Sequence, residues 1–148
     1  MAPQEHRIPG FREDGYLPEG LFLANEAEVA FRFGTSNRIR RRLVIRVRRW
    51  IEIAREVRAI RLMIDGSFVT AKAEPNDVDA VILLPNDFDT QISEDSDAAI
   101  KPEEMLLTRS PEEIFAAEDE IDWNDWIEFF SRTREADGRR KGLVEIEL

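Results

Sequence analysis

The sequence predicts an α/β (α+β) fold, in which a small mixed β-sheet is covered by a long arginine-rich helix and a tryptophan-containing helix. Three observations predict this class. Residues 37–57 carry apolar side chains at intervals of three and four, the periodicity of a helix with one buried face. Residues 78–84 form a continuous apolar run, as in a central strand covered on both faces. Residues 122–132 combine Trp123 and Trp126 with other apolar residues at helical spacing.

Length and composition favour one domain. The chain has 148 residues, of which 43% are hydrophobic and 35% charged, which is ordinary for a globular domain. Residues 1–20 are rich in proline and glycine and predict an extended leader, so a single domain is expected over residues 21–148. The absence of cysteine excludes disulfides and thiolate metal sites. Since the sequence has neither a signal-peptide pattern nor an apolar run of about 18 residues, we expect a cytoplasmic protein without membrane contact.

The charge is unevenly distributed along the chain. The net charge is −10, yet residues 36–61 contain ten arginines and two glutamates, whereas residues 74–128 contain eighteen acidic and two basic residues. One interpretation is intramolecular, with a basic helix face lying near an acidic surface. The other is an arginine-rich patch for a protein partner or a phosphate-bearing ligand. Because the whole protein is acidic, non-specific binding to duplex DNA is not expected.

The first half of the domain predicts two helices. A short helix is expected within residues 21–33, capped by Asn25 with Glu28 three residues later. A long helix is expected from a cap at Ser36 or Asn37 to about residue 57. Its predicted buried stripe comprises Ile39, Leu43, Val44, Val47, Trp50, Ile51, Ala54 and Val57. The arginines take the remaining positions and are expected to form a solvated face whose aliphatic stems cover apolar surface.

The remaining segments are expected to complete the sheet and its cover. Residues 59–64 alternate and predict the first strand, residues 114–117 predict a third, and residues 143–148 predict the last. The acidic residues 86–101 predict a loop, and residues 102–107 predict a short helix. Asp122 is expected to cap the tryptophan-containing helix, whose aromatic residues are interpreted as core rather than as a platform for stacking bases.

The stretch with the most chemical content is IDGSFVTAKAEPNDVD, residues 64–79. Asp77 and Asp79 lie two residues apart on a predicted strand, so both carboxylates project from one face. Two such carboxylates repel each other unless a cation or a proton lies between them, and oxygen ligands suit Mg²⁺ or Mn²⁺. The Gly66-Ser67 turn can bring backbone amides and a hydroxyl to phosphate oxygens, and Lys72 adds a positive charge. This combination predicts phosphoryl or nucleotidyl transfer from a nucleoside triphosphate.

Gly66-Ser67, nine intervening residues and Asp77-Val78-Asp79 together resemble the signature of the polymerase-β-type nucleotidyltransferase superfamily. The amino-acid sequence of the motif is most similar to a small bacterial subgroup of undefined function that is related to minimal nucleotidyltransferases. Residues 132–148 also resemble that subgroup. The resemblance implies that Gly66 and Ser67 hold nucleotide phosphates and that Asp77 and Asp79 hold the metal. The resemblance also permits a setting in toxin–antitoxin or defence systems, where such proteins often act beside partner proteins.

The chain departs from the pattern of this superfamily at two places. Ala71-Lys72 stands where minimal nucleotidyltransferases often carry Arg-Gly, and the third carboxylate of the superfamily is not obvious. Glu113 is the first candidate for this acid, and Asp119 is the second.

Three functions therefore stay open at the level of sequence. The first is a metal-dependent nucleotidyltransferase that moves NMP from an NTP to a hydroxyl of a protein, an RNA or a small molecule. The second is an inactive nucleotide-binding or regulatory protein of the same fold. The third is an interaction module whose arginine-rich helix binds an acidic partner. The chain has no P-loop, no complete EF-hand loop and no partners for His6 in a catalytic triad.

Overall fold

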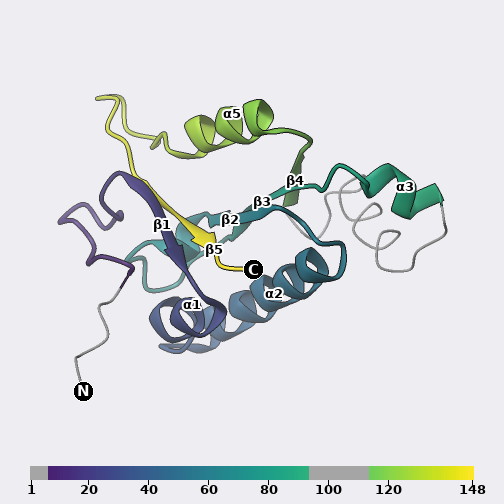
Figure 1. The fold of residues 1–148 in the computed structure, drawn as a ribbon. Helices are drawn as coiled ribbons and strands as arrows, with labels where there is room; N and C mark the ends of the chain where they lie inside the picture. The colour runs from purple at the N-terminus through teal and green to yellow at the C-terminus, as the bar shows by residue number, and fades with distance from the viewer. Residues whose placement is uncertain (1–6, 94–113) are drawn as a thin grey trace, which may run out of the picture.

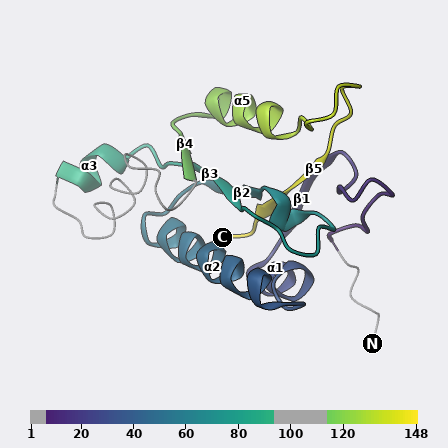
Figure 2. The ribbon, with the colours of Figure 1, turned by 180° about the vertical axis from the view of Figure 1, so that it is seen from behind.

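The computed structural model describes residues 7–93 and 114–148. It confirms the predicted α/β class: a five-stranded mixed sheet, in the order β1-β5-β2-β3-β4, lies between two helical layers (Figure 1). The elements are β1 Gly20–Ala24, α1 Glu26–Phe33, α2 Arg38–Glu56, β2 Arg61–Asp65, β3 Asp79–Leu83, α3 Phe88–Ser93, β4 Ile114–Ala117, α5 Glu120–Phe130 and β5 Gly142–Ile146. Helices α1 and α2 cover one face of the sheet and α5 covers the other, as the reverse view also shows (Figure 2).

Both predicted N-terminal helices form where their caps place them. The side chain of Asn25 accepts a hydrogen bond from the Glu28 N–H at 2.8 Å, and the Glu28 carboxylate accepts one from the Asn25 N–H at 3.2 Å. This capping box satisfies two backbone donors at the start of α1. The side chain of Asn37 caps α2 by accepting from the Arg40 N–H at 2.9 Å. The predicted stripe of α2 is confirmed, since its central residues Val47 and Trp50 are fully buried.

Strand alternation divides the core into two parts. Leu62 and Ile64 of β2 belong to the cluster that packs against α1 and α2, whereas Met63 between them belongs to the cluster that packs against Trp123 of α5. Both faces of β3 are buried in the same way, which explains its continuous apolar sequence and confirms its prediction as a central strand. The predicted strands near residues 61–65, 114–117 and 142–146 are likewise confirmed.

Several boundaries differ from the prediction. Strand β1 was not predicted, because its partner is β5, more than 100 residues away in sequence. Helix α3 occupies residues 88–93, inside the expected acidic loop, and the helix predicted at 102–107 lies outside the described residues. Helix α5 is capped by Asp119, whose side chain accepts from the Asp122 N–H at 2.8 Å, so Asp122 is not the cap. No helix in the described part of the chain is long and apolar enough to cross a membrane.

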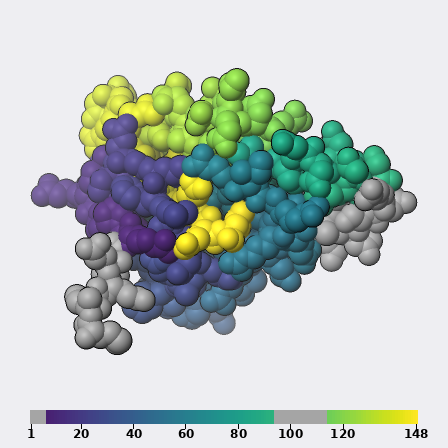
Figure 3. Space-filling model, in the orientation of Figure 1, coloured from purple at the N-terminus to yellow at the C-terminus, as the bar shows by residue number. Residues whose placement is uncertain are grey.

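The N-terminal segment is part of the body of the protein. Residues 7–19 form neither helix nor strand, as expected of a leader, yet Ile8 and Leu17 are buried in the main core. The space-filling view shows this segment (dark purple) lying against the domain (Figure 3). The leader is therefore held by apolar contacts and supplies surface to the rest of the fold.

The basic face of α2 is partly neutralised within the chain. Arg48 and Arg55 approach the carboxylate of Glu26 at 3.9 and 3.5 Å, and Arg58, just after the end of the helix, pairs with Asp87 at 2.8 Å. These contacts are exposed and contribute little to stability individually. They agree with the intramolecular interpretation of the charge asymmetry for these arginines, while binding of a protein partner by this face stays a prediction.

Candidate functional site

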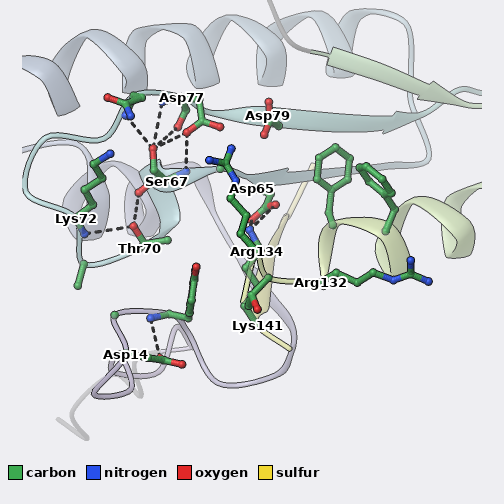
Figure 4. Close-up of a pocket in the computed structure, with 18 of the residues that line it drawn as sticks. Asp14, Asp65, Ser67, Thr70, Lys72, Asp77, Asp79, Arg132, Arg134 and Lys141 are labelled. Atoms are coloured by element: carbon green, nitrogen blue, oxygen red, sulfur yellow. Dashed lines mark hydrogen bonds and ion pairs between the residues drawn. The ribbon is translucent and has the colours of Figure 1, made fainter. Parts of the chain in front are cut away.

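The candidate site lies at one edge of the sheet, on the face that α5 covers. Strand β2 ends at Asp65, β3 begins at Asp79, and these two residues are directly paired across the antiparallel ladder. Strand β5 begins at Gly142 at the same edge, which places Lys141 beside them. Because Met63 and Val81 face α5, alternation turns the side chains of Asp65 and Asp79 to that side too. A cavity of about 1030 Å³ lies there (Figure 4).

The Gly66-Ser67 turn connects β2 to this cavity and requires a glycine. Gly66 has φ +91° and ψ −179°, a conformation that is essentially restricted to glycine. A Cβ atom at this position would lie 2.9 Å from the carbonyl oxygen of Asp77. The glycine therefore allows the end of β2 to pass close to the residues that precede β3, which brings both halves of the predicted motif together.

Ser67 binds one carboxylate of the predicted metal pair. Its backbone N–H and its hydroxyl donate to Oδ1 of Asp77 at 3.0 and 2.5 Å. The same hydroxyl accepts from the Asn76 N–H at 2.9 Å. The turn thus presents an amide and a hydroxyl to an anionic group, as predicted, but in this structure the anion is the side chain of Asp77. Contact of Ser67 with a phosphate stays a prediction.

Asp77 and Asp79 form a pair of interacting carboxyl groups. Burial alone would raise the pKa of Asp77, but hydrogen bonds from the Ser67 hydroxyl and N–H, followed by one with the side chain of Asp79, hold it below its ordinary value. The two carboxyl groups are therefore close enough to share a proton or a cation. Their oxygen donors fit Mg²⁺ or Mn²⁺ chemically. Within residues 7–93 and 114–148, no group of three or more His, Cys, Asp or Glu side chains is arranged to hold a metal ion.

Asp65 is a third acid at this edge, and the sequence analysis missed it. The residue is only 2% exposed, and both carboxylate oxygens accept from Nζ of Lys141, at 3.0 and 2.9 Å. Burial raises the pKa of Asp65 to about 6, although the attraction of Lys141 opposes the rise. The available signal was its position, at the end of an apolar strand and directly before Gly66-Ser67. Its ion partner lies 76 residues away and gave no signal.

Arg40 fixes the segment between the Gly66-Ser67 turn and the aspartates. The prediction that the arginines of α2 form a solvated face is wrong for this residue. The residue is 6% exposed, and its guanidinium donates to four backbone carbonyls. Nη1 bonds to the oxygens of Phe68 and Phe33 at 2.7 and 3.1 Å, and Nη2 bonds to those of Thr70 and Lys72 at 2.8 and 2.5 Å. Burial lowers the pKa of Arg40, yet an arginine stays cationic at neutral pH. These bonds tie the backbone of Lys72 to α2, beside the cavity.

Two segments outside the predicted motif form the opposite wall. The leader contacts the motif directly, since the carbonyl of Gly15 accepts from the Ala71 N–H at 2.8 Å. Residues 131–141 form a narrow hairpin-like excursion between α5 and β5, closed where the Lys141 N–H donates to the Ser131 carbonyl at 2.9 Å. The Tyr16 hydroxyl joins these two segments by donating to Glu135 at 3.1 Å. The cavity is thus bounded by parts of the chain that are far apart in sequence.

The structure brings the predicted residues Gly66, Ser67, Lys72, Asp77 and Asp79 together around one cavity. Glu113, the first candidate for the third carboxylate, lies outside the described residues, directly before the first residue of β4. The second candidate, Asp119, is wrong. It follows β4 at the end where Ala117 pairs with Leu83, away from Asp79, and its side chain caps α5.

Comparison with known proteins leaves the function of this site open. No curated protein and no solved structure matches the chain. A match to one protein family, described only as a family of unknown function, covers residues 9–147, which includes every element from β1 to β5. The chain therefore belongs to this family of unknown function, DUF6932.

Proposed function

We propose that this protein is a metal-dependent nucleotidyltransferase, which moves NMP from an NTP to a hydroxyl of a protein, an RNA or a small molecule. One observation carries the proposal: the carboxylates of Asp77 and Asp79 lie beside the Gly66-Ser67 turn on a cavity of about 1030 Å³. A cavity of this size is large enough for a nucleotide and part of an acceptor. The resemblance of the same residues to the polymerase-β-type superfamily supports the same reaction.

Each residue has a distinct role in this proposal. Asp77 and Asp79 would hold Mg²⁺ or Mn²⁺, which neutralises charge on the phosphates when bound. Ser67 keeps Asp77 ionised and orients it by binding Oδ1. Lys72 lies on the cavity wall, where its ammonium can pair with a phosphate oxygen. The carboxylate of Glu113 stays the proposed third acid, which would position or activate the acceptor hydroxyl.

A second candidate function is nucleotide binding without turnover, in a regulatory module. The observation that favours it is the ion pair of Asp65 with Lys141, because this pair neutralises Asp65, the acid at the sheet edge beside Asp77 and Asp79. In the described part of the chain, Asp77 and Asp79 are thus left without a third acid to complete a metal-binding group of three carboxylates. Either function is compatible with a partner protein, as in toxin–antitoxin or defence systems, and such a partner is part of the proposal.

Nucleotide binding is tested by thermal unfolding with each NTP in the presence of Mg²⁺ or Mn²⁺. A ligand at 100 times its Kd stabilises the folded state by about 2.7 kcal/mol, which corresponds to a rise in Tm of roughly 5–10 °C for a domain of this size. The Asp77→Asn/Asp79→Asn variant should fold and lose this rise. The matched control is Asp89→Asn/Asp125→Asn, which neutralises two exposed acids away from the cavity and should keep it.

Turnover is tested with α-³²P-labelled nucleotides and a lysate that contains candidate acceptors. An enzyme should label a macromolecule only when divalent metal is present, and Glu113→Gln should abolish labelling while keeping most of the nucleotide affinity. Tight binding without labelling for all four NTPs would select the regulatory module. Absence of any nucleotide binding would exclude both functions.

A further inference from the structure

Arg134 reaches the candidate site from a segment that the predicted motif does not include. It lies in the excursion between α5 and β5 and lines the same cavity as Asp77 and Asp79. Figure 4 shows its guanidinium extending toward the space beside these two carboxylates. Arg132, two residues earlier on the same segment, also lines the cavity, but its side chain points the other way in Figure 4, and its Nη2 lies 3.8 Å from Oε1 of Glu128 in α5. One of two neighbouring arginines is thus directed into the cavity.

The backbone that carries Arg134 is held at several points. Arg132 and Arg140 form an antiparallel bridge, and the Thr133 hydroxyl donates to the Arg139 carbonyl at 2.9 Å. On the other side of Arg134, the carboxylate of Glu135 accepts from the Tyr16 hydroxyl of the leader. These contacts lie immediately before and after Arg134. Its side chain therefore starts from a fixed position, which reduces the entropy lost when the guanidinium binds a ligand.

The charges around the cavity leave two cations available. Lys141 is committed to Asp65, and Arg132 lies near Glu128. Among the residues that the structure describes, neither Lys72 nor Arg134 makes a side-chain hydrogen bond or an ion pair. The guanidinium of Arg134 is exposed in the cavity and makes no hydrogen bond within residues 7–93 and 114–148, so its five donors can serve a ligand.

The acids around the cavity restrict the kind of anion that can bind. Besides Asp77 and Asp79, the wall includes Asp65, Glu13 and Asp14. Asp65 and Asp14 are paired with Lys141 and Arg12, so the carboxylates that a ligand meets are chiefly those of Asp77 and Asp79. These two would repel a free phosphate, whereas a phosphate chain that enters with a divalent cation can place the cation at the carboxylates. The cation would lie at the aspartates, and the remaining phosphate oxygens would face Arg134 and Lys72. Planar bidentate contacts to phosphate are the characteristic use of arginine.

We infer that Arg134 is the arginine that binds the phosphate chain of a metal-bound nucleoside triphosphate in this cavity. The inference rests on the proposed function for the nucleotide, and it assigns the residue that discriminates a triphosphate from a nucleoside. Lys72 supplies a second positive charge from the motif side of the cavity, without the bidentate geometry of a guanidinium.

The test compares Arg134→Gln with the matched control Arg132→Gln by calorimetric titration with Mg²⁺ and each NTP. Loss of a charge-assisted bidentate contact should weaken triphosphate binding by about 10- to 100-fold in Arg134→Gln, and by less than about 2-fold in Arg132→Gln. Arg134→Lys should recover only part of the affinity, because lysine keeps the positive charge but lacks the bidentate geometry of the guanidinium. Binding of the matching nucleoside should not change in any variant. Unaltered Tm values establish that the variants fold.

The outcomes separate this inference from the proposed function. Equal NTP affinity in the wild type and Arg134→Gln would overturn the role of Arg134 and leave the proposed function standing. If the wild type binds NTP, Arg134→Gln weakens this binding and no acceptor is labelled, nucleotidyl transfer fails as the function and the role of Arg134 stands. If the wild type binds no NTP, both the proposed function and the inference are overturned.

Discussion

Replacing Lys141 with methionine removes the cation that faces the buried carboxylate of Asp65. The ammonium lies 3.0 and 2.9 Å from the two carboxylate oxygens, and the side chains are 13% and 3% exposed. Even with this partner, burial raises the pKa of Asp65 from 3.8 to about 6, which corresponds to roughly 3 kcal/mol against the ionised form. Without the partner, the buried charge is uncompensated. We expect Lys141→Met to lower the free energy of unfolding by about 3–5 kcal/mol at pH 8.

The measurement is urea unfolding followed by fluorescence, because Trp50 and Trp123 are fully buried and report on the loss of the core. At pH 5 the loss should be smaller, because Asp65 is then largely protonated and needs no cation. The double variant Asp65→Asn/Lys141→Met should recover most of the stability. Lys72→Met, which removes an exposed lysine from the same cavity, should change it by no more than about 0.5 kcal/mol.

The reasoning would be refuted by a loss below about 1 kcal/mol at pH 8, or by equal losses at pH 5 and pH 8. Either result would mean that the carboxylate of Asp65 obtains its stabilisation from another source, such as water in the cavity. A double variant that is as unstable as Lys141→Met would likewise show that the lysine acts through packing of its stem.

Three further predictions follow from the same elements. Arg40→Met leaves four backbone carbonyls without a donor and should lower the free energy of unfolding by about 2–5 kcal/mol in denaturant titrations, whereas Arg41→Met, on the exposed face, should stay within about 0.5 kcal/mol. Gly66→Ala forces a Cβ against the Asp77 backbone and should cost more than about 2 kcal/mol, whereas Gly138→Ala, where the space is open, should cost about 1 kcal/mol. Because the pKa of Asp65 in the folded protein exceeds its ordinary value, its carboxyl group stabilises the folded state most below about pH 4 and loses this contribution as the pH rises through 6. Comparing the free energy of unfolding of the wild type and of Asp65→Asn over this pH range measures the contribution.

The sequence by itself determined the elements that depend on neighbouring residues. The capping box of Asn25 and Glu28 and the apolar stripe of α2 are patterns within a few turns of one helix, so their signals are local. The continuous apolar run of β3 predicted a strand buried on both faces. The core of the candidate site was predictable for the same reason, because Gly66-Ser67 and Asp77-Val78-Asp79 lie within 14 residues of one another in the sequence.

Only the tertiary structure decided which charged residues are buried and with which partners. Arg40 lies three and four residues before Leu43 and Val44, so its position on the buried side was visible, but the carbonyls that make burial favourable come from a different segment. Lys141 meets Asp65 only because β5 enters the sheet beside β2. Strand β1 needed the same partner strand, since five residues with no regular alternation do not indicate a strand by themselves.

The walls of the cavity depend on the fold as well. Tyr16 and Glu135 join the leader to the excursion that carries Arg134, across 119 residues of sequence. An arginine in a polar turn gives the same local signal whether its side chain points into a cavity or into solvent. The sequence therefore determined the local secondary structure and the aspartate pair, whereas the ion pairs and the cavity were decided by contacts between distant segments, because burial and electrostatic compensation are properties of the packed chain.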